Sequence, residues 1–259
     1  MICLSKNLTD RYINDFAKGS NLPIQDYTDP IPDDPILIRS IVKKDLIQSR
    51  LKNKKTFYYM DSGYFGNYKS IGNPTGLKLF HRIVKNGLQH DKIIERPSDR
   101  WDALGIPLHK QKQNGKHILL VLPSGKPCKF YNIDLEQWTL NTIDTIKKYT
   151  DRPIKIREKE GRTQRLKKSI YKDLEKCHAV VTLQSIAAIE SVAFGVPAFT
   201  LAPTAADPVC DKNLSKIENP TIHHIDKLRA WAHHLAYGQF HISEFQNGKA
   251  WRLLQKDES

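Results

Sequence analysis

The chain has 259 residues, with 41 Lys and Arg against 28 Asp and Glu, so its formal net charge at pH 7 is +13. This length allows a buried core in one large domain or two small ones. No apolar run approaches a membrane span and the N-terminus lacks the pattern of a cleaved signal peptide, so we expect a soluble cytoplasmic protein without a membrane partner. The positive charge favours encounter with polyanions such as nucleic acid, a nucleotide-sugar diphosphate or an anionic polysaccharide.

The four cysteines lie far apart in the sequence and form no Cys-x-x-Cys pair. This spacing argues against a disulfide framework and against a zinc site, and it indicates reduced thiols.

The first 105 residues alternate short apolar runs with amphipathic stretches, which is the pattern of an α/β domain. The helix predicted at 41–54 has an apolar face and a strongly basic opposite face. The elements predicted in this half are strands at 1–4, 36–39, 56–60 and 79–84, and helices at 10–18 and 41–54.

One acidic residue of this half, Asp61, comes directly after a predicted strand and before Ser62-Gly63. Open α/β sheets bind their ligands beyond the carboxyl ends of parallel strands, so Asp61 is a candidate catalytic carboxylate. Asp before Ser-Gly is also a common turn sequence, and the two interpretations remain open here.

A polar segment at 91–115, interrupted by Pro97, Gly105 and Pro107, is predicted to link two domains. The expected domains are therefore 1–105 and 116–259. The elements predicted after this segment are strands at 117–122, 153–157, 179–183 and 196–201, and helices at 135–149, 169–176, 185–194 and 225–237.

The stretch 178–201 reads as a complete strand–helix–strand unit. Ser185 is placed to cap its helix and Gly195 to end it. Glu190 falls inside the apolar face of that helix, where a carboxylate is costly unless something hydrogen-bonds it. It is either satisfied by a nearby backbone group or Lys, or it reaches into a cleft to hold sugar hydroxyls.

This unit resembles the donor-nucleotide site of GT-B glycosyltransferases, in which a helix N-terminus faces the donor phosphates and a Glu binds ribose. The resemblance implies two Rossmann-like α/β domains with a cleft between them, and a C-terminal segment that packs back on the N-terminal domain. The residues that match the donor site are Thr182, Gln184, Ser185 and Glu190, followed by Gly195 and Pro197.

Further donor-binding residues are expected after two other strands. Ser124, Gly125 and Lys126 resemble the GT-B loop that meets the donor, and Arg157, Arg162 and Arg165 could neutralise a diphosphate or form an exposed turn. No Asp-x-Asp motif is present, so the resemblance implies metal-independent transfer from a nucleotide-sugar such as a UDP-sugar, with no cofactor and with Asp61 as the base.

The acceptor hypotheses start from the basic N-terminal half. Its segments Tyr59-x-Asp61-x-Gly63-Tyr64-Phe65 and Arg82…Asn86 resemble bacteriophage proteins, and a basic surface with exposed aromatics (Tyr58, Tyr64, Phe65 and Tyr68) suits a flipped base. The first hypothesis is therefore a phage glycosyltransferase, monomeric in the host cytoplasm, acting on hydroxymethylated bases in DNA. Its expected DNA contacts are Lys43, Lys44, Arg50, Lys54, Tyr64 and Arg82.

Two alternatives remain open. One is a glycosyltransferase that builds a surface polysaccharide. The other is a non-catalytic DNA-binding protein on an α/β scaffold, against which Glu190 argues, because phosphate binding alone needs no carboxylate on an apolar helix face.

Overall fold

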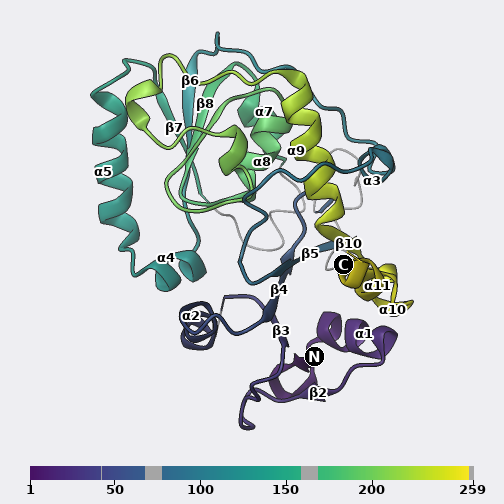
Figure 1. Cartoon of the computed structure of the whole chain (residues 1–259). Coiled ribbons are helices and arrows are strands. Elements are labelled where there is room, and N and C mark those ends of the chain that lie inside the picture. The colour runs from purple at the N-terminus through teal and green to yellow at the C-terminus, as the bar shows by residue number, and fades with distance from the viewer. Residues whose placement is uncertain (42, 68–77, 159–168, 257–259) are drawn as a thin grey trace. The chain divides into compact units, whose positions relative to one another are not determined.

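The computed structural model describes residues 1–41, 43–67, 78–158 and 169–256 (Figure 1). The chain forms two compact units, each with its own sheet. Both sheets contain parallel strands joined by helices, which confirms the predicted α/β class. The first unit contains residues 1–63, 78–88 and 238–259, and the second contains residues 64–77 and 89–237.

The sheet of the first unit has the strand order β10-β5-β4-β3-β1-β2. Strands β1 to β4 run parallel, whereas β5 runs antiparallel to both β4 and β10. The central strands are buried runs of Ile, Leu, Phe and Tyr, residue types that favour a pleated, covered strand. The strands are β1 (Ile2–Leu4), β2 (Ile24–Gln25), β3 (Ile36–Arg39), β4 (Phe57–Ser62), β5 (Phe80–Lys85) and β10 (Gln239–His241).

Three helices cover one face of this sheet, and α2 lies on the other side (Figure 1). Their shared core contains Phe16 of α1, Tyr58 of β4 and Phe245 of α10, and the rings of Phe16 and Phe245 lie 5.5 Å apart. The C-terminal segment thus belongs to the first unit, as the resemblance implies. The helices are α1 (Arg11–Ser20), α2 (Lys44–Lys52), α10 (Ile242–Gln246) and α11 (Lys249–Lys256), with a short 3-10 turn at Lys6–Leu8.

The contact between α1 and α10 depends on Gly19. A Cβ atom at this position would lie 2.0 Å from the Phe245 carbonyl oxygen. Gly19→Ala should therefore lower the free energy of unfolding by about 1–3 kcal/mol, because overpacking outweighs the better helix propensity of Ala. Urea denaturation measures this change. Gly125→Ala is the matched control, since a Cβ there meets nothing within 4 Å; equal midpoints for the two variants would contradict the prediction.

The sheet of the second unit has the order β7-β6-β8-β9, and all four strands are parallel. The two inner strands, β6 and β8, are buried along their whole length, as expected for strands covered on both faces. The strands are β6 (His117–Val121), β7 (Ile154–Arg157), β8 (Cys177–Thr182) and β9 (Ala198–Thr200).

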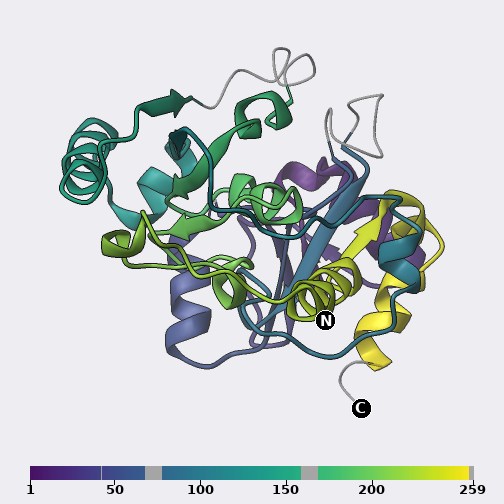
Figure 2. The ribbon, with the colours of Figure 1, turned by 90° about the horizontal axis from the view of Figure 1, so that it is seen from above.

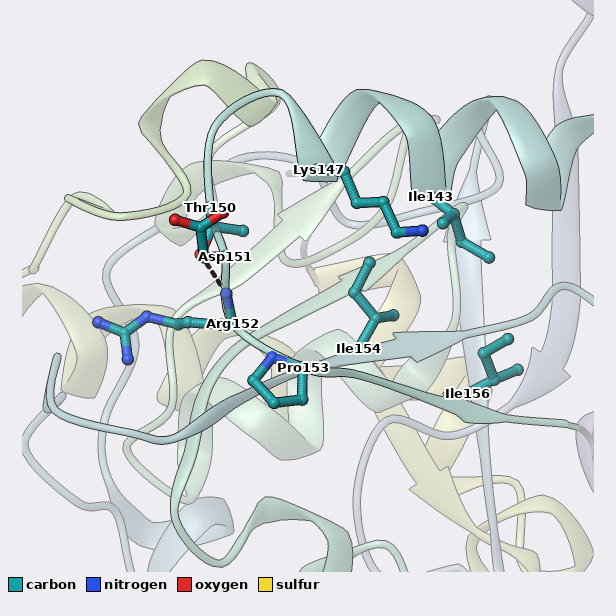
Figure 3. Close-up of a pocket in the computed structure, with 8 residues that line it drawn as sticks. All are labelled: Ile143, Lys147, Thr150, Asp151, Arg152, Pro153, Ile154 and Ile156. Carbon is teal, nitrogen blue, oxygen red and sulfur yellow. Dashed lines mark hydrogen bonds between the residues drawn. The ribbon is translucent and has the colours of Figure 1, made fainter.

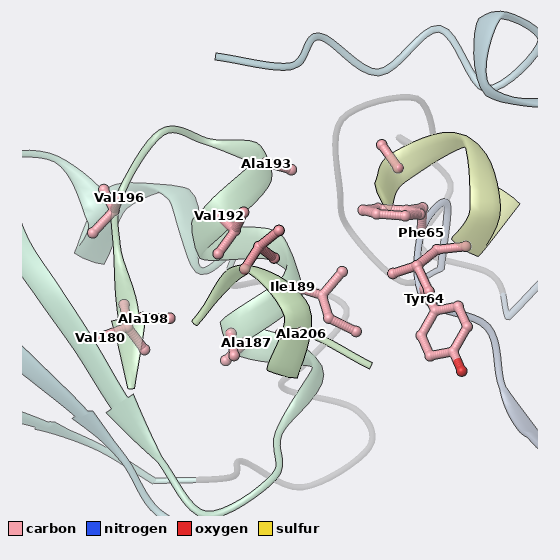
Figure 4. Close-up of a cluster of buried hydrophobic side chains, with 14 of the residues drawn as sticks. Tyr64, Phe65, Val180, Ala187, Ile189, Val192, Ala193, Val196, Ala198 and Ala206 are labelled. Atoms are coloured by element: carbon pink, nitrogen blue, oxygen red, sulfur yellow. The ribbon is translucent and has the colours of Figure 1, made fainter. Parts of the chain in front are cut away.

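Helices cover both faces of this second sheet. Figures 1 and 2 show α5 on one side and α8 with α9 on the other. Figure 4 shows Ile189 and Val192 of α8 among the apolar side chains beside Val180 and Ala198 of the sheet. The helices are α3 (Asp99–Asp102), α4 (Gly125–Tyr131), α5 (Leu135–Lys147), α7 (Tyr171–Leu174), α8 (Ile186–Ala193) and α9 (Ile225–Tyr237), with 3-10 turns at Asp207–Val209 and Leu214–Lys216.

The segment predicted as an interdomain linker lies inside the second unit. Trp101 and Ile106 are buried in its core, and the backbone N–H of Lys112 donates to the Gly195 carbonyl at 2.9 Å. Gly195 has φ +88°, and a Cβ there would lie 2.6 Å from the Lys110 carbonyl oxygen. This glycine therefore ends α8 and also leaves room for the backbone of the segment 108–113, called the strap below. The boundaries of the units therefore differ from those predicted at 105 and 116, because buried side chains and backbone hydrogen bonds join the polar strap to α8.

Candidate active site

The second unit has a switch in strand order between β6 and β8. From β6 the chain passes to β7 on one side and then returns to β8 on the other. In open α/β sheets, ligands bind beyond the carboxyl ends of the strands at such a switch. Ser124, Gly125 and Lys126 follow β6, and Gln184 and Ser185 follow β8. The two loops predicted to bind the donor thus leave this sheet at its switch point.

Side-chain hydrogen bonds hold the end of β8 and the loop that follows it. The Ser185 Oγ caps α8 by accepting from the Ala187 N–H at 3.2 Å. The Gln184 side-chain oxygen accepts from the Tyr131 hydroxyl at 3.1 Å, which ties the end of α4 to the start of α8. The Thr182 hydroxyl donates to the Val121 carbonyl at 3.0 Å and is fully buried. Thr182 is therefore corrected from a donor ligand to a link between β8 and β6.

Glu190 lies in the second turn of α8 and is partly exposed. Burial raises the pKa of its carboxyl group to about 7, an effect that the nearby positive charge of Arg157 opposes. Such a carboxyl group changes protonation near neutral pH, which is typical of functional sites. Its place favours the interpretation of Glu190 as a ligand for hydroxyl groups, and that role stays a prediction.

The predicted basic residues have different surroundings. Lys126 is exposed at the second residue of α4. Arg157 ends β7 and pairs with Asp173 of α7. A phosphate that bound to the Arg157 guanidinium would therefore share it with the Asp173 carboxylate. Arg162 and Arg165 lie outside the described residues. Asp173 and Tyr131 were not predicted from the sequence, because neither stands in a motif and each partner is far along the chain.

Asp61 ends β4 in the first unit and accepts two hydrogen bonds. The Tyr59 hydroxyl donates to it at 2.8 Å and the Ser62 N–H at 2.7 Å, and Arg82 lies 3.9 Å away. Burial by itself would raise the pKa of Asp61, but Arg82, Lys78 and these two donors together lower it below the ordinary value. Asp61 is thus ionised at neutral pH but is a weak proton acceptor. Its role as the base remains a prediction.

Three residues predicted to contact DNA are buried. The Arg50 guanidinium donates to backbone carbonyls, including that of Asp34 at 3.0 Å. Arg82 donates to the Ser62 carbonyl at 2.7 Å. The Tyr64 ring lies in the core of the second unit, and its hydroxyl contacts His90 Nδ1 at 2.8 Å. We correct all three to structural roles, because both guanidinium groups are bound to backbone carbonyls and the Tyr64 ring packs in the core.

The predicted aromatic surface is also corrected. Tyr58 and Phe65 are buried like Tyr64, and Tyr68 lies outside the described residues. Lys43 and Lys54 are exposed and Lys44 is partly exposed, but the Asp-rich loop at 26–34 contacts α2 through Arg50, and Asp33 of this loop pairs with Lys55. The carboxylates of this loop weaken the positive field that a nucleic acid would meet.

A hollow on the second unit is lined by the end of α5 and by β7 (Figure 3). It lies at the amino-terminal end of β7, where Ile143 and Ile154 line it together with Lys147 and Arg152. Ligands of parallel sheets bind at the opposite, carboxyl edge. We therefore do not place the donor in this hollow.

No family model matches this sequence, and no curated protein matches it. Solved structures do match over nearly the whole chain. Two of them come from Thermosulfurimonas dismutans KpsC: the β-Kdo 2,4 transferase, with a TM-score of 0.52, and the β-Kdo 2,7 transferase, with a TM-score of 0.53. The fold is that of a glycosyltransferase. The sequence identities are 9% and 12%, and the matches cover 89% and 99% of both chains, respectively.

At these identities the likeness shows the fold alone. It agrees with the predicted glycosyltransferase architecture and gives no support to the phage DNA-modifying type. None of the helices in the described part of the chain has the length and apolar composition needed to cross a membrane. Metal independence and the monomeric state stay predictions.

Proposed function

We propose that this protein is a glycosyltransferase of surface-polysaccharide synthesis that uses a nucleotide-activated sugar. The observation that carries the proposal is Glu190 on α8, a carboxyl group in an apolar face that feels the charge of Arg157 at the carboxyl end of β7. A carboxylate there can accept hydrogen bonds from ribose hydroxyls, while the α8 N-terminus and Lys126 supply positive potential for phosphate groups. The neighbours that share the fold are named as Kdo transferases, so a saccharide acceptor is favoured over DNA.

The proposed chemistry is sugar transfer to a hydroxyl group. The bond between the anomeric carbon and the nucleotide phosphate breaks, a bond to the acceptor oxygen forms, and the acceptor proton passes to a base. Positive groups at the donor site stabilise the departing phosphate. Asp61 is the carboxylate proposed to act at the acceptor hydroxyl.

The test is a transfer assay on the full chain. UDP-, GDP- and CMP-sugars and an activated Kdo are incubated with saccharide acceptors and, separately, with hydroxymethylated and unmodified DNA, and products are identified by mass. Transfer to a saccharide supports the proposal. Transfer to the modified base alone would restore the DNA hypothesis, and transfer from no donor would contradict the enzymatic assignment.

A binding series separates the two acceptors further. If Lys43, Lys44 and Lys54 do not serve DNA, the affinity for duplex should be weak at low salt and should change little when these lysines are replaced. A DNA-binding surface would instead lose affinity steeply with salt, and each phosphate contact removed would reduce the salt slope by roughly one unit. Filter binding between low and physiological salt measures the slope.

A further inference from the structure

A polar cluster in the first unit lies at the switch point of its own sheet. From β1 the chain passes to β2 on one side and then to β3 on the other. Arg39 ends β3, and Asp10 precedes α1 shortly after β1. The position is therefore the one at which open α/β sheets bind ligands.

Asp10 holds two parts of this cluster in place. Its Oδ1 caps α1 by accepting from the Tyr12 N–H at 3.1 Å, and its Oδ2 pairs with Arg39 Nη1 at 2.6 Å. The Arg39 guanidinium carbon lies 4.6 Å from the centroid of the Tyr12 ring. A cation is thus held over the face of an aromatic ring before any ligand arrives.

His81 completes the cluster from β5. Its ring centroid lies 4.0 Å from that of Tyr12, and its side chain is fully buried. Among the described residues, neither ring nitrogen of His81 has a hydrogen-bond partner, and the buried Nε of Arg39 has none either. Buried polar atoms without partners are rare in native proteins, and three of them around one tyrosine point to a ligand that the cluster is built to receive.

The charges around Tyr12 indicate the kind of ligand. Lys78 Nζ lies 5.9 Å from the centroid of the same Tyr12 ring. Burial, Lys78 and Arg39 lower the pKa of His81 to about 2, so the ring is neutral and offers one donor and one acceptor. Among the described residues, the charges that act on His81 are those of the cations Lys78, Arg39 and Arg82 and of the carboxylate Asp61, and Asp10 pairs with Arg39, so cations outnumber carboxylates here.

We propose that Arg39, His81, Lys78 and the Tyr12 ring form a site for a sugar bearing an anionic group, a carboxylate or a phosphate, and that this site selects acidic acceptors. The arginine and the lysine meet the anion, and the histidine bonds to the hydroxyl groups of the sugar, while the Tyr12 ring holds the Arg39 guanidinium and the His81 ring in place. Asp61 lies on β4, the neighbour of β3, so an acceptor bound here is brought to the carboxylate proposed as the base. The inference rests on the proposed function.

The test measures binding to the full chain without a nucleotide-sugar. Ligand-observed NMR titrations use glucuronate, glucose 6-phosphate and glucose, which separate a carboxylate from a phosphate and both from a neutral sugar. At least one anion should bind roughly ten-fold more tightly than glucose, because charge-assisted hydrogen bonds distinguish them. Equal binding of all three sugars would overturn the proposal.

Variants assign the binding to this cluster. Arg39→Met and His81→Phe should each weaken anion binding by about ten-fold. Arg11→Met is the matched control, because Arg11 lies on the same helix as Tyr12 with its side chain 73% exposed, and binding should not change. His81→Phe fills the ring position between Tyr12 and Phe245, so it carries the test if Arg39→Met unfolds. Anion binding that neither folded variant weakens would place the site elsewhere.

The outcome is distinguishable from that of the proposed function. Sugar transfer without preference for an anionic acceptor would overturn this inference alone. Anion binding at the cluster without transfer from any nucleotide-sugar would overturn the proposed function alone.

Discussion

Glu190→Gln should weaken the binding of UDP or another nucleoside diphosphate by roughly 10- to 100-fold while the protein stays folded. A carboxylate that accepts hydrogen bonds from ribose hydroxyls contributes about 1.5–3 kcal/mol, and an amide replaces this only in part. Calorimetric titration measures the affinity. Glu136→Gln on α5 is the control, because that carboxylate is exposed at a helix start on the opposite face of the sheet.

The pH dependence of stability tests the same residue independently. The pKa of Glu190 is about 7 in the folded chain against an ordinary value of 4.5. Between these values the folded protein keeps a proton that the unfolded chain has lost, so this residue makes stability fall as pH rises from about 4.5 to about 7. Gln does not titrate, so the free energy of unfolding of Glu190→Gln, relative to that of the parent, should rise between about pH 4.5 and about pH 7.

The two measurements together decide between the interpretations of Glu190. Nucleotide affinity should rise in the parent as Glu190 ionises and should lack that component in the variant, and comparison at each pH cancels the titration of the phosphate itself. An unchanged affinity in Glu190→Gln with a changed stability profile would show that the carboxylate is structural.

Asp61→Asn should lower kcat by about 10²- to 10⁴-fold with little change in KM, if Asp61 takes the proton of the acceptor. The low pKa of Asp61 adds a second expectation. Because Arg82 and two hydrogen bonds keep this carboxylate ionised, kcat/KM should show no acid limb near its ordinary pKa. Steady-state kinetics across pH measure both effects, with the exposed Asp34→Asn in the same unit as the control.

Tyr59→Phe separates a base from a residue that only positions the acceptor. The variant removes the hydroxyl that donates to Asp61 at 2.8 Å and should raise the pKa of that carboxyl group. If Asp61 is the base, the acid limb of kcat/KM moves to higher pH. Turnover of Asp61→Asn within a few-fold of the parent, or an acid limb that does not move in Tyr59→Phe, would rule out the base assignment.

Most strands and helices were predictable from the sequence because their signals are local. The period-3.6 pattern and a terminal glycine identify α8, and buried β-branched runs identify β6 and β8. Helix α4 was missed, because Ser124-Gly125-Lys126-Pro127 has the composition of a turn. Glu190 could be singled out from its helix face alone, since a carboxylate among apolar residues contradicts that pattern.

The partners of charged and aromatic side chains could not be predicted in this way. Arg50 shares its helix with Lys44 and Lys52, yet Arg50 is buried against the carbonyls of the loop at 32–34. Tyr64 stands in a polar, glycine-containing stretch and is nevertheless buried against His90. Exposure depends on which distant segment covers a residue, and that information is absent from the local pattern.

The sequence by itself determined the α/β class, the strand–helix–strand unit around Glu190 and the net positive charge, because periodicity and composition are properties of neighbouring residues. Only the tertiary structure decided that the strap at 108–113 closes over α8, that Asp173 holds Arg157, and that Tyr12, Arg39 and His81 meet at one switch point. These contacts join residues far apart in the chain, and burial and charge pairing between them follow from strand order, which no local pattern specifies.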